Sequence, residues 1–106
     1  MKVVIKKAGK EPEIKEIENE LCVLQEIVGG YIECFHIFDN VLCVCNEEGK
    51  LKGLPTNFIF GGDTIVGDVF FVAAGEEDFE SLDNYQIEVI MNTMMAIERV
   101  RKKKQK

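Results

Sequence analysis

The chain has 106 residues, of which 46% are hydrophobic and 30% are charged, and its 19 acidic residues outnumber its 13 Lys and Arg. This composition excludes a disordered or low-complexity chain. No apolar run approaches the roughly 20 residues of a membrane span, and residues 1–20 lack the basic start and apolar block of a signal peptide. We therefore expect one globular domain in the cytoplasm.

Charge is unevenly distributed along the chain. Residues 99–106 hold six positive charges and no acid, so residues 1–98 carry seven positive and 19 negative charges, a net of −12. We interpret 1–98 as a single acidic domain and 99–106 as a basic helix end or tail, which suits the negative C-terminal end of a helix dipole. Because an acidic body repels nucleic acids and anionic membranes, neither is an expected partner.

The first elements are two short strands and a helix. The β-branched run 2–7 and the alternating run 13–17 predict strands that form a hairpin. A helix is expected over about 20–28, with Asn19 as its N-cap. Gly29 follows at the position where a helix commonly ends.

Two apolar runs follow, over 31–38 and 41–46, and the pair Asp39-Asn40 separates them. Asp and Asn tolerate the left-handed conformations that a tight hairpin turn needs. The second run is apolar on both faces, which predicts a central strand.

The next segment, 50–64, contains three Gly and one Pro, which argues against a long regular element. A strand resumes over 65–73, with Gly67 as a bulge or a close approach of two backbones.

The last element is a helix over about 84–101, begun by Asp83 with Gln86 as its capping-box partner. Its main apolar stripe contains Ile87, Ile90, Met91, Met94 and Ile97. The whole pattern predicts an α+β fold, a mainly antiparallel sheet of about five strands with a short helix and a long C-terminal helix packed on it.

Three further apolar residues of this helix, Val89, Ala96 and Val100, project roughly opposite the main stripe. They are either scattered small residues on a helix surface or a second seam that packs on another subunit. The second interpretation predicts a homodimer joined through the C-terminal helix.

The cysteines Cys22, Cys34, Cys43 and Cys45 form no CxxC pair, so we expect free thiols. A two-residue turn after the first of the two apolar runs would pair His36 with Cys43 and Cys34 with Cys45. All four side chains would then share one sheet face as a zinc ligand set. The favoured alternative is a group of buried, small side chains with one satisfied histidine, without metal or cofactor.

An enzyme is the less favoured class. His36 is the only histidine and lies inside an apolar run. Asp63 and Asp68 are an odd number of residues apart, which puts them on opposite faces of a regular strand. A small enzyme would need Asp63, Asp68 or Cys43 to converge in one pocket.

The glycine-rich stretch GLPTNFIFGGD is the preferred candidate for a ligand or partner loop. Gly53, Gly61 and Gly62 would expose backbone N–H groups, and Asn57 and Asp63 would add polar side chains. The alternative is that these glycines only turn the chain.

Four runs, GKEPEIKEIEN, LQEIVGGYIE, CNEEGKLKGLPTN and GGDTIVGDVF, resemble the family known as domain of unknown function 3846, over about residues 1–90. The resemblance implies an accessory gene of a phage, plasmid or gut bacterium. The family provides no established catalytic residues to carry over.

Together these patterns predict a non-enzymatic binding module that holds a small anionic ligand or a host protein through the 53–63 loop. The alternatives are a structural or regulatory homodimer and an acidic inhibitor that mimics DNA.

Overall fold

The computed structural model describes residues 1–104, which form an α+β domain of eight strands and two helices. In chain order the elements are β1 (Lys2–Lys6), β2 (Glu13–Glu16), α1 (Leu21–Val28), β3 (Ile32–Phe38), β4 (Val41–Asn46), β5 (Thr56–Phe60), β6 (Asp63–Val66), β7 (Val69–Ala74), β8 (Phe79–Glu80) and α2 (Asn84–Lys104). The predicted fold class is confirmed.

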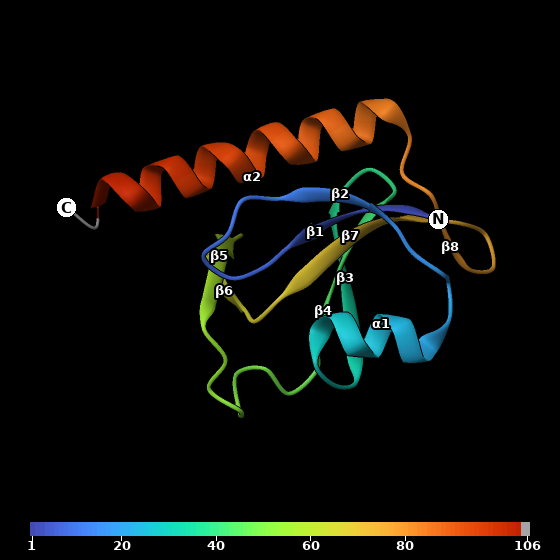
Figure 1. The fold of residues 1–106 in the computed structure, drawn as a ribbon, viewed down its shortest axis with the longest axis horizontal. Helices are drawn as coiled ribbons and strands as arrows, with labels where there is room; N and C mark the ends of the chain where they lie inside the picture. Colours follow the sequence, from blue (N-terminus) through green and yellow to red (C-terminus); the bar gives the residue numbers. More distant parts are fainter. Residues whose placement is uncertain (105–106) are drawn as a thin grey trace.

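The main sheet is antiparallel, in the order β2-β1-β7-β4-β3, with the short β8 added beside β7 (Figure 1). Every residue of the central strand β4 is buried, because layers cover both of its faces. The hairpin β5-β6 forms a separate two-stranded sheet.

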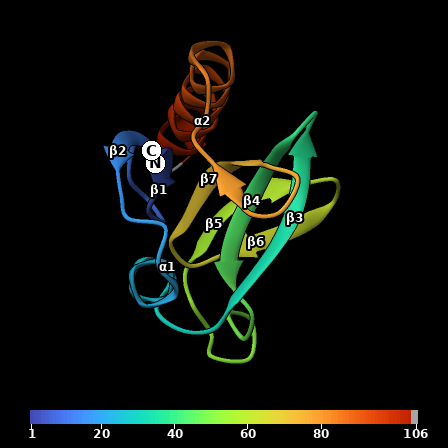
Figure 2. The same ribbon diagram turned by 90° about the vertical axis from the view of Figure 1, so that its right-hand side faces the viewer.

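The helices α1 and α2 lie on opposite faces of the main sheet (Figure 2). Alternation along the strands divides the core into two clusters. On the α1 side, Leu24 and Val28 pack against Val44 and Phe70. On the other side, α2 shares its cluster with Phe58 of the β5-β6 hairpin, so the helix and the hairpin cover one face of the sheet together.

The start of α2 agrees with its sequence signature. The Asp83 carboxylate accepts a hydrogen bond from the Gln86 N–H at 2.8 Å, and the Gln86 side-chain oxygen accepts one from the Asp83 N–H at 2.9 Å. The helix continues three residues beyond the predicted end at 101. The last two residues of the predicted basic tail, 105–106, lie outside the described part of the chain.

The start of α1 differs from the prediction. Glu20, not Asn19, is the N-cap residue, and its side chain makes no capping hydrogen bond. The Asn19 amide instead reaches the backbone oxygen of Phe79 at 3.5 Å, because the chain enters the helix beside β8. The helix ends at Gly29 as predicted.

The glycine-rich segment is more regular than predicted, since much of it forms the β5-β6 hairpin. Gly61 and Gly62 have φ angles of +57° and +82° at the hairpin tip. Two consecutive positive φ angles are what a two-residue turn of type I′ requires. Gly61 and Gly62, which in the sequence suggested an irregular segment, therefore make the turn of a regular hairpin possible.

Gly67 divides the predicted strand 65–73 into β6 and β7. Its φ is +78°, and a Cβ atom there would lie only 2.8 Å from the Leu54 Cδ1. Its N–H donates a hydrogen bond to the Pro55 oxygen at 2.7 Å. The chain therefore bends sharply at Gly67, and β6 leaves the main sheet to pair with β5.

Candidate functional site

The hairpin β3-β4 has a different register from the one that the zinc hypothesis requires. Phe38 pairs with Val41 as predicted, but an irregularity between His36 and Phe38 shifts the ladder by one residue. His36 consequently pairs with Leu42 instead of Cys43.

This shift separates the four proposed zinc ligands. Cys34 and His36 pair with residues of the α1-side cluster, whereas Cys43 and Cys45 belong to the α2-side cluster. The prediction that they share one face is wrong, because a one-residue slip reverses the faces. No group of three metal-ligating side chains is found within residues 1–104.

The two inward-facing thiols are poor nucleophiles. Burial raises the pKa of Cys43 well above its ordinary value, with smaller contributions from Cys45 and Cys34. Burial, together with the carboxylate of Glu33 and other nearby groups, raises the pKa of Cys45 to about 11. Both thiols are therefore protonated at neutral pH, in the form that does not attack.

The carboxylates proposed for a small enzyme do not converge. Asp63 pairs with Lys50 at the outer end of the hairpin. Asp68 accepts a hydrogen bond from the Ala8 N–H at 3.0 Å, in a different part of the surface. The buried Cys43 lines neither of the two pockets that these aspartates line.

The predicted ligand loop divides into exposed and buried parts. Gly53, Gly61, Gly62 and Asp63 are exposed. Asn57 is fully buried, so its side chain cannot meet a ligand at the surface. Its inclusion in a surface loop is the part of the prediction that the structure contradicts, because the residue lies on a strand.

The Asn57 amide joins three segments of the chain. Its Nδ2 donates to the backbone oxygens of Lys6 and Gly67, both at 2.8 Å, and its Oδ1 accepts from the Lys6 Nζ at 3.1 Å. These bonds hold β5 against the end of β1 and against the bend between β6 and β7. The role of Asn57 is thus to fix the hairpin on the domain.

A buried ion-pair network lies beside this amide. The Lys6 Nζ is 2.8 Å from the Glu98 Oε1, and the two side chains are 0% and 4% exposed. The Arg101 Nη1 contacts the same Glu98 oxygen at 3.3 Å and donates to the Asn57 backbone oxygen at 2.8 Å. The C-terminal half of α2 is thereby attached to both β1 and β5.

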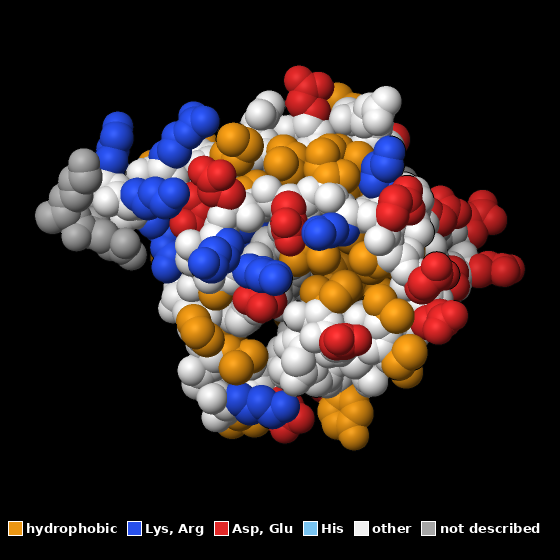
Figure 3. Space-filling model, in the orientation of Figure 1, with side chains coloured by type: hydrophobic (Ala, Val, Ile, Leu, Met, Phe, Trp, Pro, Cys, Tyr) orange, Lys and Arg blue, Asp and Glu red, His pale blue; other side chains and the backbone are white. Residues whose placement is uncertain are grey.

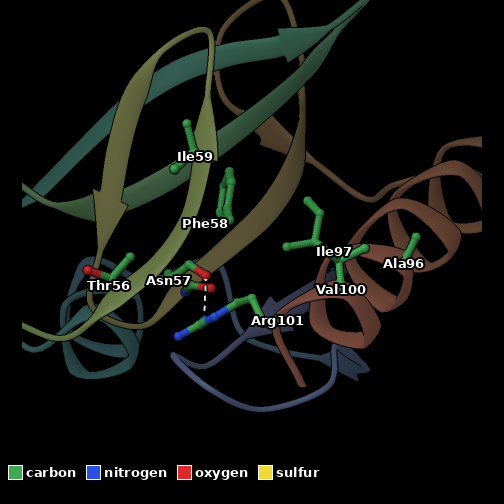
Figure 4. A pocket seen from close by; sticks show the side chains of 8 residues that line it. All are labelled: Thr56, Asn57, Phe58, Ile59, Ala96, Ile97, Val100 and Arg101. Atoms are coloured by element: carbon green, nitrogen blue, oxygen red, sulfur yellow. Dashed lines mark hydrogen bonds between the residues drawn. The ribbon is translucent and has the colours of Figure 1, made fainter. Parts of the chain in front are cut away.

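An apolar groove of about 440 Å³ lies between β5 and this half of α2 (Figure 4). Its lining comes from two segments far apart in sequence: Thr56, Asn57, Phe58 and Ile59 from β5, and Ala96, Ile97, Val100 and Arg101 from α2. Ile59 is 67% exposed and Val100 is 53% exposed. Large apolar side chains this open, gathered around one groove, are typical of a surface that binds a partner.

The predicted dimer seam is only partly continuous with this groove. Ala96 and Val100 are exposed and line it, whereas Val89 is half-buried and lies outside it. The second apolar stripe noted in the sequence therefore corresponds in part to the groove wall.

Charge is separated along the molecule. On the face shown in Figure 3, Lys and Arg side chains gather at the end where α2 terminates and Asp and Glu side chains at the opposite end. The exposed cations Arg99, Lys102 and Lys103 belong to the last turns of α2. The apolar groove therefore opens beside a basic surface on a chain whose net charge is −6.

A second pocket, of about 350 Å³, lies between the β3-β4 hairpin and β6. Three carboxylates line it, those of Glu33, Glu47 and Asp63, and the Lys50 ammonium is already paired with Asp63. An excess of negative charge disfavours a small anion here.

Sequence reasoning missed Lys6, Glu98 and Arg101, although a signal for them exists. Glu98 and Arg101 follow Met94 by four and seven residues, so both continue the main apolar stripe of α2. A charged side chain on an apolar stripe indicates a buried ion pair or a functional site.

A family model described as "Domain of unknown function (DUF3846)" matches residues 1–95, which confirms the resemblance found in the sequence runs. No curated protein and no solved structure matches the chain significantly. Within residues 1–104, neither helix has the combination of length and hydrophobicity that crossing a membrane requires.

Proposed function

The chain belongs to the family of domain of unknown function 3846, and we propose that it is a non-enzymatic module that binds a segment of another protein in the groove between β5 and α2. The observation that carries the proposal is the open apolar lining, in which Ile59 and Val100 are more than half exposed. Exposing such side chains to water is unfavourable, and covering them with apolar partner groups would release that cost.

The groove includes the β5 part of the predicted 53–63 segment, and it is a better candidate than the hairpin tip of that segment. The amide of Asn57 is committed to internal hydrogen bonds, and the Lys50 charge is matched by Asp63. Residues 53–63 themselves contain no Lys or Arg that would attract a small anion. The exposed glycines at the hairpin tip have no side chain to offer a partner, whereas the groove is lined mainly by apolar side chains.

A protein segment also suits the shape of the groove. Its two walls come from a strand, β5, and a helix, α2 (Figure 4), and the exposed side chains of Ile59 and Val100 on the two walls show that it is open to solvent. Grooves of this kind accept apolar side chains spaced along a peptide. The four free cysteines support a cytoplasmic location, and an accessory role in a phage, plasmid or gut bacterium is compatible with a small adaptor.

The test is selection of a random twelve-residue peptide library on the full chain, followed by fluorescence anisotropy with the selected peptides. Val100→Glu and Ala96→Glu should each weaken binding by about tenfold or more, because a carboxylate would enter the apolar contact. Asn92→Glu is the matched control, since it adds the same charge to α2 at an exposed position outside the groove.

Two outcomes would overturn the proposal. One is that the selected peptides bind Val100→Glu and wild type equally well. The other concerns self-association, measured by sedimentation. A wild-type dimer that becomes a monomer on Val100→Glu would show that a second copy occupies the groove, as the homodimer alternative predicts.

A further inference from the structure

The Arg101 guanidinium forms the polar end of the groove and is 31% exposed. Its Nη1 donates to the Asn57 backbone oxygen and contacts the Glu98 carboxylate. Within residues 1–104 its other N–H groups donate to no protein acceptor, although a guanidinium carries five N–H donors. The side chain is thus held in place through one nitrogen beside Asn57 (Figure 4), and the further donors of this partly exposed residue at the groove remain unpaired among the described residues.

The charges around Arg101 do not balance. Lys6 and Arg101 contribute two positive charges, and Glu98 is the one carboxylate that pairs with either of them in the described chain. The network therefore carries a net charge of +1 at the end of an apolar groove. A positive charge that is partly withdrawn from water gains most from a negative group that joins it there.

We infer that Arg101 binds a carboxylate of the partner segment, so that the groove selects an Asp or Glu placed next to apolar side chains. This inference rests on the proposed function. A carboxylate matches the planar fork of a guanidinium and can accept two parallel hydrogen bonds from it. Glu98 and the Asn57 backbone oxygen fix the guanidinium beforehand, which lowers the entropy that binding would cost.

The surrounding charges favour an acidic protein segment over other anions. Arg99, Lys102 and Lys103 lie on the same helix end and attract acidic residues that flank the contact. Residues 1–98 carry a net charge of −12, which repels an extended polyanion such as a nucleic acid or an anionic membrane. A short peptide can contact the basic end of α2 without lying along the acidic surface of residues 1–98.

The test uses the peptides selected from the random library on the full chain. They should be enriched in Asp or Glu beside Leu, Ile, Val or Phe. Changing that acid to Asn or Gln in a selected peptide should weaken its binding to the wild type by about tenfold or more. The same peptide change should have less than about a threefold effect on Arg101→Gln, because the donor fork that distinguishes the two peptides is gone.

Arg99→Gln is the matched control, because it removes an identical, exposed charge from the same turn of α2. It should retain the full preference for the acidic peptide. The peptide comparison on the wild type needs no protein variant, so the absence of a preference for the acid would overturn the inference even if Arg101→Gln were unstable.

Failure of this inference is distinguishable from failure of the proposed function. Selected peptides that depend on Val100 but show no preference for an acid would overturn the carboxylate contact alone. If Arg101→Gln and Arg99→Gln reduced the preference for the acidic peptide equally, the inference would also be overturned, because general charge attraction would then explain that preference. Peptides that do not depend on Val100 would overturn both proposals.

Discussion

At the scale of single residues, the polar side chains with the greatest structural effect are those that the fold buries. Asn57 and Lys6 are completely enclosed, and each satisfies groups on segments far away in the sequence. A buried polar group costs free energy unless it is hydrogen-bonded, and the loss of either side chain would leave the other without one of its hydrogen-bond partners. Replacing either residue would leave buried polar groups without a hydrogen-bond partner, and the resulting loss of stability measures its structural role.

The first prediction concerns Asn57→Ala. The substitution leaves the backbone oxygens of Lys6 and Gly67 without their buried donor and removes one acceptor from the Lys6 ammonium. We expect the free energy of unfolding to fall by about 2–4 kcal/mol, since each buried unsatisfied group costs about 1–3 kcal/mol. Urea denaturation followed by circular dichroism measures this loss.

Asn92→Ala is the control for that measurement, because it makes the same chemical change at an exposed position of α2. We expect its effect on the free energy of unfolding to stay within about 0.5 kcal/mol. Similar losses for the two variants would contradict the role assigned to the buried amide.

The second prediction concerns the buried thiols. The pKa of Cys45 rises from 9.0 to about 11 on folding, and burial raises the pKa of Cys43 as well. Below about pH 9 both states hold these protons and stability does not change. Above it the unfolded chain loses them first, so stability falls as pH rises.

We therefore expect urea denaturation to give a lower free energy of unfolding at pH 10 than at pH 8. Cys43→Ala/Cys45→Ala should lose less stability over that interval than the wild type does. Cys22→Ala/Cys34→Ala, which alters the two exposed thiols, should show the full loss. An equal alkaline loss in all three proteins would assign it to other groups.

At the scale of elements, α2 is attached differently along its length. Its first half packs on the sheet through Ile87, Ile90 and Met94. Its second half is held by the ion pairs of Glu98 with Lys6 and Arg101. Polar attachment leaves the neighbouring apolar residues of this half, including Val100, free to line the groove.

The third prediction tests this attachment with Lys6→Met. The change leaves Glu98 buried with only Arg101 as an ionic partner, so we expect a loss of about 3–5 kcal/mol. Lys6→Met/Glu98→Leu should recover at least half of that loss, because a well-packed apolar pair often replaces a buried ion pair without cost. Urea denaturation of the single and double variants gives both values.

The matched control is Lys50→Met, which breaks the ion pair with Asp63, in which both side chains are more than half exposed. A solvent-exposed pair contributes about 0–1 kcal/mol, and the loss should be no larger. A double variant no more stable than Lys6→Met would indicate that the ion pair itself, rather than the unpaired charge, determines stability.

At the scale of the whole molecule, charge separation is the dominant feature. Residues 1–98 have a net charge of −12, while six positive charges lie in 99–106. Like charges on the acidic body repel one another and lower stability, and dissolved salt screens this repulsion. Glu76 and Glu77 are adjacent and exposed on the loop between β7 and β8.

The fourth prediction follows from this repulsion. Raising the NaCl concentration from about 20 mM to about 300 mM, which shortens the screening length to well below 10 Å, should raise the midpoint of thermal unfolding. Glu76→Gln/Glu77→Gln should raise the midpoint at low salt and have a much smaller effect at high salt. Calorimetry checks both; a variant effect independent of salt would contradict an electrostatic origin.

The sequence alone determined those features of the fold that depend on local interactions. The capping box of Asp83 and Gln86 defined the start of the long helix, and Gly29 defined the end of the short one. The pair Asp39-Asn40 between two apolar runs predicted the hairpin of β3 and β4. These features depend on residues within one or two turns of each other, so a sequence pattern contains them.

Only the tertiary structure decided the register of β3 and the position of Asn57. A bulge changes the register by one residue without changing the composition of the strand, so the cysteine–histidine set separates onto two faces. The ammonium of Lys6 meets Asn57 51 residues away and Glu98 92 residues away. Contacts over such separations leave no periodic pattern, and the groove beside them exists because the chain folds β5 against α2.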